Sequence, residues 1–128
     1  MNARVAQLLD QGQSIWQDDI SRGQITSGSL AAMIEDVGVR GVTSNPTIFE
    51  KAISGSSDYD AQIAELSKGD LSTAETFEQL AVTDIRNACD VFRPIYDLSD
   101  GADGFVSIEV TPDLARDAGG TREATRRL

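Results

Sequence analysis

The stretch Gly38–Ala52, GVRGVTSNPTIFEKA, constrains the fold of this chain more than any other. Val39–Thr43 is short, apolar and rich in β-branched residues, which predicts a buried strand. Asn45 is a good N-cap and Pro46 suits the first helical position, so the pattern predicts a helix that continues to Ile53. A polar side chain therefore stands at the C-terminal tip of a strand, where parallel α/β sheets and barrels bind their ligands.

Two further strands are expected, at Ser14–Asp18 (SIWQD) and at Phe105–Val110 (FVSIEV). The predicted order of elements is α-β-α-β-α-α-α-β-α, and helices between strands imply right-handed crossovers and a parallel sheet. Residues 21–23 are expected in a loop, and Gly119-Gly120 is expected to break the chain. The expected helices cover Asn2–Leu9, Thr26 or Ser27 to Val37, Thr47–Ile53, Asp58–Leu66, Ser72 (with its Ser72-x-x-Glu75 capping box) to about Arg93, where Pro94 should end or kink the helix, and Thr121–Leu128.

Composition narrows the class of protein. The 128 residues suit one domain at most, and the formal net charge of −10 argues against nucleic acid or an anionic membrane surface as a partner. The single cysteine, Cys89, provides no internal disulfide and is expected to be a small core residue on a helix face. The chain has no histidine, no stretch approaching ~20 apolar residues and no signal-peptide pattern at its start, so a cytoplasmic location is expected.

Three polar side chains follow or end the predicted strands: Asp18, Asn45 and Glu109. Because the C-terminal ends of parallel strands lie on one side of the sheet, these groups can converge on one site. Two carboxylates and an amide suit proton transfer and hydroxyl recognition. Each has a simpler alternative: Asn45 only caps the helix, Asp18 is a solvated loop residue, and Glu109 points to solvent rather than lying buried inside its strand, where an unpaired carboxylate is costly.

Two other uses of the acidic residues stay open. Asp18, Asp19 and Glu109 can supply carboxylate oxygens to a hard cation. Asp18-Asp19 after a first strand is also typical of the acidic pocket of a Mg²⁺-dependent receiver-like switch. Such a domain needs an Asp at the end of a later strand, and here the second strand ends in Asn45.

Three segments together resemble one known family. VTSNPTIFEKAI is similar to the strand-turn-helix segment of transaldolases, and IWQDDISRG and FVSIEVTPDLA resemble the first and third strands of the bacterial branch of that family. The resemblance implies a (β/α)8 TIM barrel, of which residues 1–128 would be the N-terminal fragment, about three βα units plus extra helices. It also implies transfer of a dihydroxyacetone unit from sedoheptulose 7-phosphate to glyceraldehyde 3-phosphate in the pentose phosphate pathway, through a lysine Schiff base and without metal or organic cofactor.

By the same resemblance, Asp18 would be the acid–base residue of carbon–carbon cleavage, and Glu109 would act with a water in forming and hydrolysing the Schiff base. Asn45, with its neighbours Thr43 and Ser44, would bind the substrate. The family lysine lies on the strand after the one that holds Glu109. This chain has only Lys51 and Lys68, neither at a strand tip.

The chain alone is therefore expected to lack transaldolase activity. The alternative is a non-catalytic α/β module that binds sugar phosphates. The sequence leaves the oligomeric state open.

Overall fold

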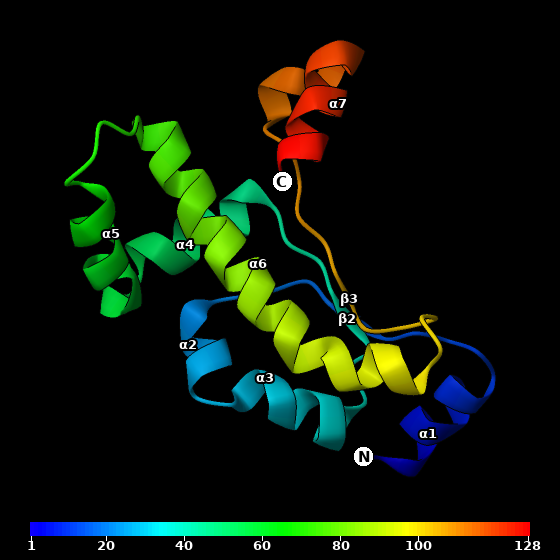
Figure 1. Cartoon of the computed structure of the whole chain (residues 1–128). Helices are drawn as coiled ribbons and strands as arrows, with labels where there is room; N and C mark the ends of the chain where they lie inside the picture. Colours follow the sequence, from blue (N-terminus) through cyan, green and yellow to red (C-terminus); the bar gives the residue numbers. More distant parts are fainter.

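The computed structural model describes residues 1–128, and Figure 1 shows the chain as a set of helices around a short sheet. None of the helices combines the length and apolar character that crossing a membrane requires. The elements in chain order are α1 (Ala3–Asp10), β1 (Trp16–Gln17), α2 (Arg22–Thr26), α3 (Ser29–Ala32), a π-helical turn (Met33–Val37), β2 (Gly41–Val42), α4 (Pro46–Ser54), a 3₁₀ turn (Ser57–Tyr59), α5 (Asp60–Leu66), α6 (Thr73–Leu98), β3 (Phe105–Val106), a 3₁₀ turn (Pro112–Arg116) and α7 (Ala118–Arg127).

The sheet is parallel, with its three strands in the order β1-β2-β3. Trp16 pairs with Gly41 and Gly41 with Phe105, so the first residues of the three strands are in register. This confirms a mixed α/β chain with a parallel sheet, but each paired segment is only two residues long. The prediction that Glu109 lies within the third strand is wrong, because pairing ends at Val106 and Glu109 is exposed beyond the strand end.

The core lies where α6 packs over the sheet and over α2 and α3 (Figure 1). The apolar stripe predicted for α6 is confirmed, since residues three or four positions apart on one face of that helix are buried. Cys89 is half-buried on the same face, as expected for a small core residue. The nine core residues are Ile20, Leu30, Val39, Val42, Phe49, Ala81, Ile85, Ala88 and Phe92.

The two predicted caps are confirmed. Asn45 caps α4 by accepting a hydrogen bond from the Ile48 N–H at 3.0 Å, with Pro46 at the first helical position. Ser72 and Glu75 form the complete capping box at the start of α6. Both devices are local, because a side chain satisfies N–H groups of the helix that it starts.

Three boundary predictions are wrong. The loop expected at residues 21–23 is instead the Ser21 cap and the start of α2. Pro94 does not end α6, which continues to Leu98, because a proline removes only one hydrogen bond and the last turn packs against β3. The break expected at Gly119-Gly120 is absent, because both lie in the first turn of α7, where the Asp117 carboxylate accepts the Gly120 N–H at 2.9 Å.

Two glycines let large groups approach the sheet. A Cβ at Gly41 would lie 2.5 Å from the indole of Trp16, so the bare backbone of β2 is the surface on which that ring rests. Gly104 has a positive φ of 87°, and a Cβ there would lie 2.5 Å from the backbone nitrogen of Tyr96. Side chains are excluded at both positions, which fixes how β1 and α6 pack on β2 and β3.

Candidate functional site

The C-terminal ends of the three strands open into a cavity of about 600 Å³. Asp18 follows β1, Asn45 follows β2 and Glu109 follows β3, and all three line this cavity. The parallel sheet brings them together because its strands all end at the same edge. The other lining residues come from α4 and from the segment after β3: Pro46, Thr47, Ile48, Lys51, Val110 and Pro112.

Asp18 is exposed and oriented by a neighbouring strand. Its Oδ1 accepts a hydrogen bond from the Thr43 hydroxyl at 2.7 Å, and the Thr43 backbone N–H donates to the Gln17 carbonyl at 2.9 Å. Thr43 therefore fixes both the main chain before Asp18 and the carboxylate itself. The second oxygen of Asp18 makes no hydrogen bond to protein, so it is free to exchange a proton with a ligand in the cavity.

The adjacent carboxylate behaves differently. Asp19 does not line the cavity, and its Oδ2 accepts a hydrogen bond from Gln24 at 2.8 Å. No group of three or more acidic, histidine or cysteine side chains comes together in a way that could hold a metal ion. The structure therefore does not gather Asp18, Asp19 and Glu109 into the cation site considered from the sequence.

Asn45 caps α4 and also lines the cavity, which confirms the cap, whereas its binding of a substrate stays a prediction. Its Oδ1 accepts the Ile48 N–H as the helix cap, which identifies the other amide atom as nitrogen. The Nδ2 group makes no hydrogen bond to protein, while the residue lines the cavity. One side chain thus starts α4 and also leaves two N–H donors available to a ligand.

The hydroxyls of Thr43 and Ser44 already donate to protein. Thr43 donates to Asp18, whereas Ser44 is 2% exposed and donates to the Ser107 carbonyl at 2.7 Å. In return, the Ser107 hydroxyl accepts the Ser44 backbone N–H at 3.3 Å. Ser44 therefore joins the ends of β2 and β3, which sets the distance between the segments that carry Asn45 and Glu109.

Glu109 lies between two cavities. It lines the cavity of about 600 Å³ described above, here called the polar cavity, and with Asn45 it also lines an adjoining cavity of about 440 Å³. Phe49, Phe77 and Ile108 give this second cavity a largely apolar wall, while Glu78 and Arg127 close it at the side of α7. The Glu109 side chain makes no hydrogen bond or ion pair with protein, so it stays available for a ligand or water.

Lys51 is the only basic side chain that lines the polar cavity. It is exposed on α4 and forms no ion pair, whereas Lys68 pairs with Glu65 at 2.5 Å on the surface. The sequence did not lead us to place Lys51 at the site. The α4 helix brings it there because it follows Thr47 and Ile48 by four and three residues, the spacing that puts side chains on one helix face.

The arrangement suits acid–base chemistry on a hydroxylated ligand. A carboxylate with one free oxygen, a second carboxylate without protein partners and a fixed amide with two free donors surround the same space. Carboxylates placed in this way can take and return protons, and the amide can hold a hydroxyl or carbonyl oxygen.

Comparison with known proteins identifies the family. The profile of the Transaldolase/Fructose-6-phosphate aldolase family matches residues 15–128, and the chain therefore belongs to this family. It is 52% identical over 110 residues to a transaldolase of Trichodesmium erythraeum, which covers 86% of this chain and 29% of that protein. It is 48% identical over 128 residues to a transaldolase of Acidothermus cellulolyticus, covering 100% of this chain and 34% of that protein. A transaldolase of Neisseria gonorrhoeae is 49% identical over 117 residues, 91% of this chain and 33% of that protein.

The chain thus spans about a third of the length of the curated relatives that it matches. The family is the one that the strand-end segments resembled. The roles of individual residues are not given by the match and have to be argued from the site.

Proposed function

We propose that this chain supplies the acid–base and hydroxyl-binding side of a transaldolase active site. The observation that carries the proposal is that Asp18, Asn45 and Glu109 line one cavity at the ends of consecutive parallel strands. Residues 1–128 would form the first part of a single (β/α)8 barrel domain. Active sites in such barrels lie at the C-terminal ends of the strands.

Each of the three residues has a separate role in the proposed reaction. Asp18 takes the proton from the sugar hydroxyl when the carbon–carbon bond breaks and returns it when the new bond forms. Asn45 holds the dihydroxyacetone unit through its free Nδ2 donors. Glu109 acts with a water in forming and hydrolysing a Schiff base on a lysine, which the family places on the next strand. The amine carrier makes an aldol reaction possible without metal or organic cofactor.

The charge of the cavity supports the binding of the hydroxylated part of the substrate there. Two carboxylates and one lysine line it, so it is formally negative and disfavours a phosphate group. We therefore place the hydroxylated carbons of the sugar phosphate here and expect its phosphate to bind elsewhere in the barrel. The family's place in the pentose phosphate pathway and the single cysteine support a cytoplasmic location.

The test is a segment exchange. The matching segment of the Acidothermus cellulolyticus transaldolase is replaced by all 128 residues of this chain, and dihydroxyacetone transfer from sedoheptulose 7-phosphate to glyceraldehyde 3-phosphate is measured. We expect an active protein. Asp18→Asn should lower kcat by about 100-fold or more, the usual effect of a positioned acid–base group.

Matched controls separate chemistry from folding. Asp19→Asn removes an equally exposed carboxylate from the adjacent position, outside the cavity, and should leave kcat within about threefold of the parent. Asn45→Ser keeps an oxygen for the helix cap but removes the amide donors, so it should raise KM or lower kcat while α4 stays folded. An active segment-exchanged protein that is indifferent to Asp18→Asn contradicts the proposal.

The 128-residue chain alone should show no covalent trapping by borohydride with fructose 6-phosphate. Lys51 and Lys68 are its only lysines, and both lie on helices or at a helix end on the surface. Binding of sugar phosphate by a segment-exchanged protein that does not turn over would instead favour the non-catalytic binding module.

A further inference from the structure

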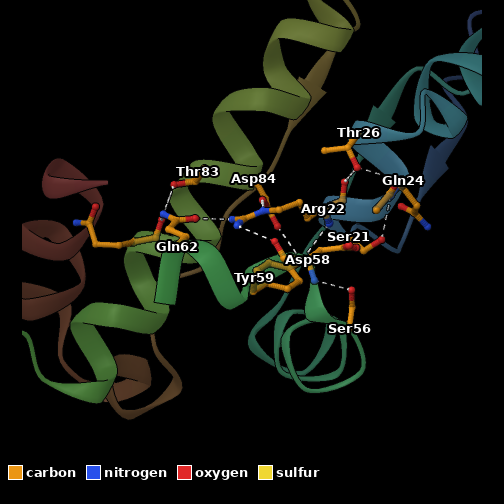
Figure 2. A network of polar contacts seen from close by, with 12 residues as sticks. Ser21, Arg22, Gln24, Thr26, Ser56, Asp58, Tyr59, Gln62, Thr83 and Asp84 are labelled. Carbon is orange, nitrogen blue, oxygen red and sulfur yellow. Dashed lines mark hydrogen bonds and ion pairs between the residues drawn. The ribbon is translucent and has the colours of Figure 1, made fainter. Parts of the chain in front are cut away.

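A buried ion pair lies outside the residues that line the two cavities and takes no part in the chemistry described so far. The Arg22 Nε donates to Oδ1 of Asp84 at 2.8 Å, and the side chains of these residues are 13% and 0% exposed. Figure 2 shows Arg22 reaching from α2 to Asp84 on α6 and to Gln62 on α5, where its Nη2 donates to Oε1 of Gln62 at 2.7 Å. The guanidinium also lies 4.4 Å from the centre of the Tyr59 ring.

Tyr59 links the Asp84 carboxylate to the main chain of Arg22. Its hydroxyl donates to Oδ2 of Asp84 at 2.8 Å and accepts the backbone N–H of Arg22 at 3.0 Å. Asp84 therefore holds residue 22 twice, directly through the guanidinium and indirectly through the tyrosine hydroxyl. No buried side-chain nitrogen or oxygen in the structure lacks a hydrogen-bond partner, so this cluster has no free group to offer a ligand.

The cluster anchors one end of a short segment whose other end is Asp18. Residues 18–20 donate no backbone hydrogen bond, so side chains hold the main chain there; the Gln17 Nε2, for example, donates to the Asp19 carbonyl at 2.8 Å. Thr43 holds Asp18, the fully buried Ile20 fixes the middle, and Ser21 caps α2 just before Arg22. Arg22 follows Asp18 by four residues, and its ion pair with Asp84 is the charged, buried attachment of this segment.

Stability alone is a weak reason for this arrangement. Desolvation offsets much of the attraction in a buried ion pair, and apolar residues of similar size often stabilise a core as well. Apolar residues would not fix the orientation of the segment as strictly. The planar guanidinium does, because its N–H groups fit their partners in only one orientation. Acid–base catalysis depends on such direction, since a displacement of about 1 Å can cost about 100-fold in rate.

We propose that Arg22 and Asp84, linked through Tyr59, are positioning residues that hold Asp18 at its place in the active site. The inference rests on the proposed function, because it requires Asp18 to be the acid–base residue. Arg22 and Asp84 do not touch the substrate and act only through the main chain between residues 18 and 22.

The first test uses the segment-exchanged transaldolase with Arg22→Lys and, separately, Tyr59→Phe. The lysine keeps the charge but loses the fork, so kcat should fall about 10- to 100-fold while KM changes less than about threefold. Tyr59→Phe removes one hydroxyl and should lower kcat less, by about 3- to 10-fold; it stands in if Arg22→Lys does not fold. Phe92→Leu, which perturbs α6 at a fully buried position outside the cluster, should leave kcat unchanged at a temperature where all variants are folded.

The second test is a double-mutant cycle with Asp18→Asn. If Arg22 acts through Asp18, Arg22→Lys should change the remaining kcat of Asp18→Asn by less than about threefold. Equal losses in both backgrounds would overturn the inference and leave the proposed function standing. Full activity of Asp18→Asn would instead remove the proposed function, and the inference with it.

A readout without turnover completes the experiment. The carboxyl ¹³C resonance of Asp18, assigned by its disappearance in Asp18→Asn, should shift or broaden in Arg22→Lys and stay in place in Phe92→Leu. An unchanged Asp18 resonance in Arg22→Lys contradicts the inference, whether or not the segment-exchanged protein is active.

Discussion

Residues 1–98 and residues 107–128, here called the body and the C-terminal arm, are held by different forces. All nine residues of the apolar core lie in the body, between Ile20 and Phe92. The arm contains a single buried side chain, Ala124, and Figure 1 shows α7 lying away from the helices α1 to α3. Its attachment is mainly polar: Ser107 forms hydrogen bonds with Ser44, and Arg127 makes two to Glu78, at 3.1 and 2.7 Å, while the partly buried Ile108 is its one apolar residue packed against the core.

The difference matters because the candidate site spans both regions. Asp18 and Asn45 belong to the body, where burial fixes the backbone, whereas Glu109 belongs to the arm. Apolar burial is the larger source of stability, and exposed polar contacts add little. The two carboxylates are therefore expected to differ in mobility, with Asp18 held firmly and Glu109 held loosely.

The largest effect should come from the core of the body. Phe92 is fully buried on α6, so Phe92→Ala should lower the free energy of unfolding by about 3–5 kcal/mol. Chemical denaturation followed by circular dichroism measures this change. Leu98→Ala on the same helix removes a side chain that is 85% exposed and should alter stability by less than about 0.5 kcal/mol. Similar losses in the two variants would show that α6 is not the centre of the core.

High pH should lower the stability of the body through deprotonation of Tyr59. Burial raises the pKa of Tyr59 from 10.0 to about 12, and the hydrogen bond to Asp84 adds to this shift. The folded state therefore keeps a proton that the unfolded state has lost, so stability is fully present below pH 10 and falls between pH 10 and 12, by about 2–3 kcal/mol. Denaturation midpoints across that range measure the fall. Tyr59→Phe should remove most of it, and a midpoint in Tyr59→Phe that falls as in the parent would contradict the assignment.

A smaller effect should come from the link between body and arm. Ser44→Ala deprives the Ser107 carbonyl of its hydroxyl donor and should cost about 1 kcal/mol. Hydrogen exchange should rise in residues 107–110 more than in α6, because the arm loosens first. Ser54→Ala is the control, since that exposed hydroxyl only contacts the Lys51 carbonyl of its own helix. Uniform changes in exchange along the chain would mean that body and arm unfold as one unit.

The smallest effect is expected at the far end of the arm. Arg127→Ala removes an exposed ion pair to Glu78, so global unfolding should not change measurably. Amides of α7 should exchange faster at low salt, with the difference between variant and parent shrinking as salt screens the pair. Arg126→Ala removes a neighbouring arginine that makes no ion pair and should leave α7 exchange unchanged.

Features that depend on neighbours in sequence were predictable. The Asn45 cap, the Ser72–Glu75 capping box and the α6 stripe each involve residues a few positions apart, so the pattern is visible in the chain itself. The order of strands and helices followed from these features, and with it the gathering of Asp18, Asn45 and Glu109 at one cavity.

Features that depend on distant partners were not predictable. A loop was expected at residues 21–23, where α2 in fact begins, and the partners that anchor this helix, Tyr59 and Asp84, lie 37 and 62 residues from Arg22. The third strand was expected to reach Val110, but its alternating residues do not reveal that pairing with β2 stops at Val106. Nothing in the sequence indicates that Thr43 and Asp18, 25 residues apart, share a hydrogen bond.

The double role proposed for Asn45, helix cap and ligand donor, would have an entropic consequence for binding. An exposed amide normally samples several rotamers, and ordering such a polar side chain on binding costs conformational entropy. At Asn45 the Oδ1 is already bound to the Ile48 N–H, so the amide can neither rotate nor flip without uncapping α4. The ordering of the Nδ2 donors is thus complete when the helix folds, and the substrate proposed to bind here would gain its hydrogen bonds without first having to immobilise the side chain.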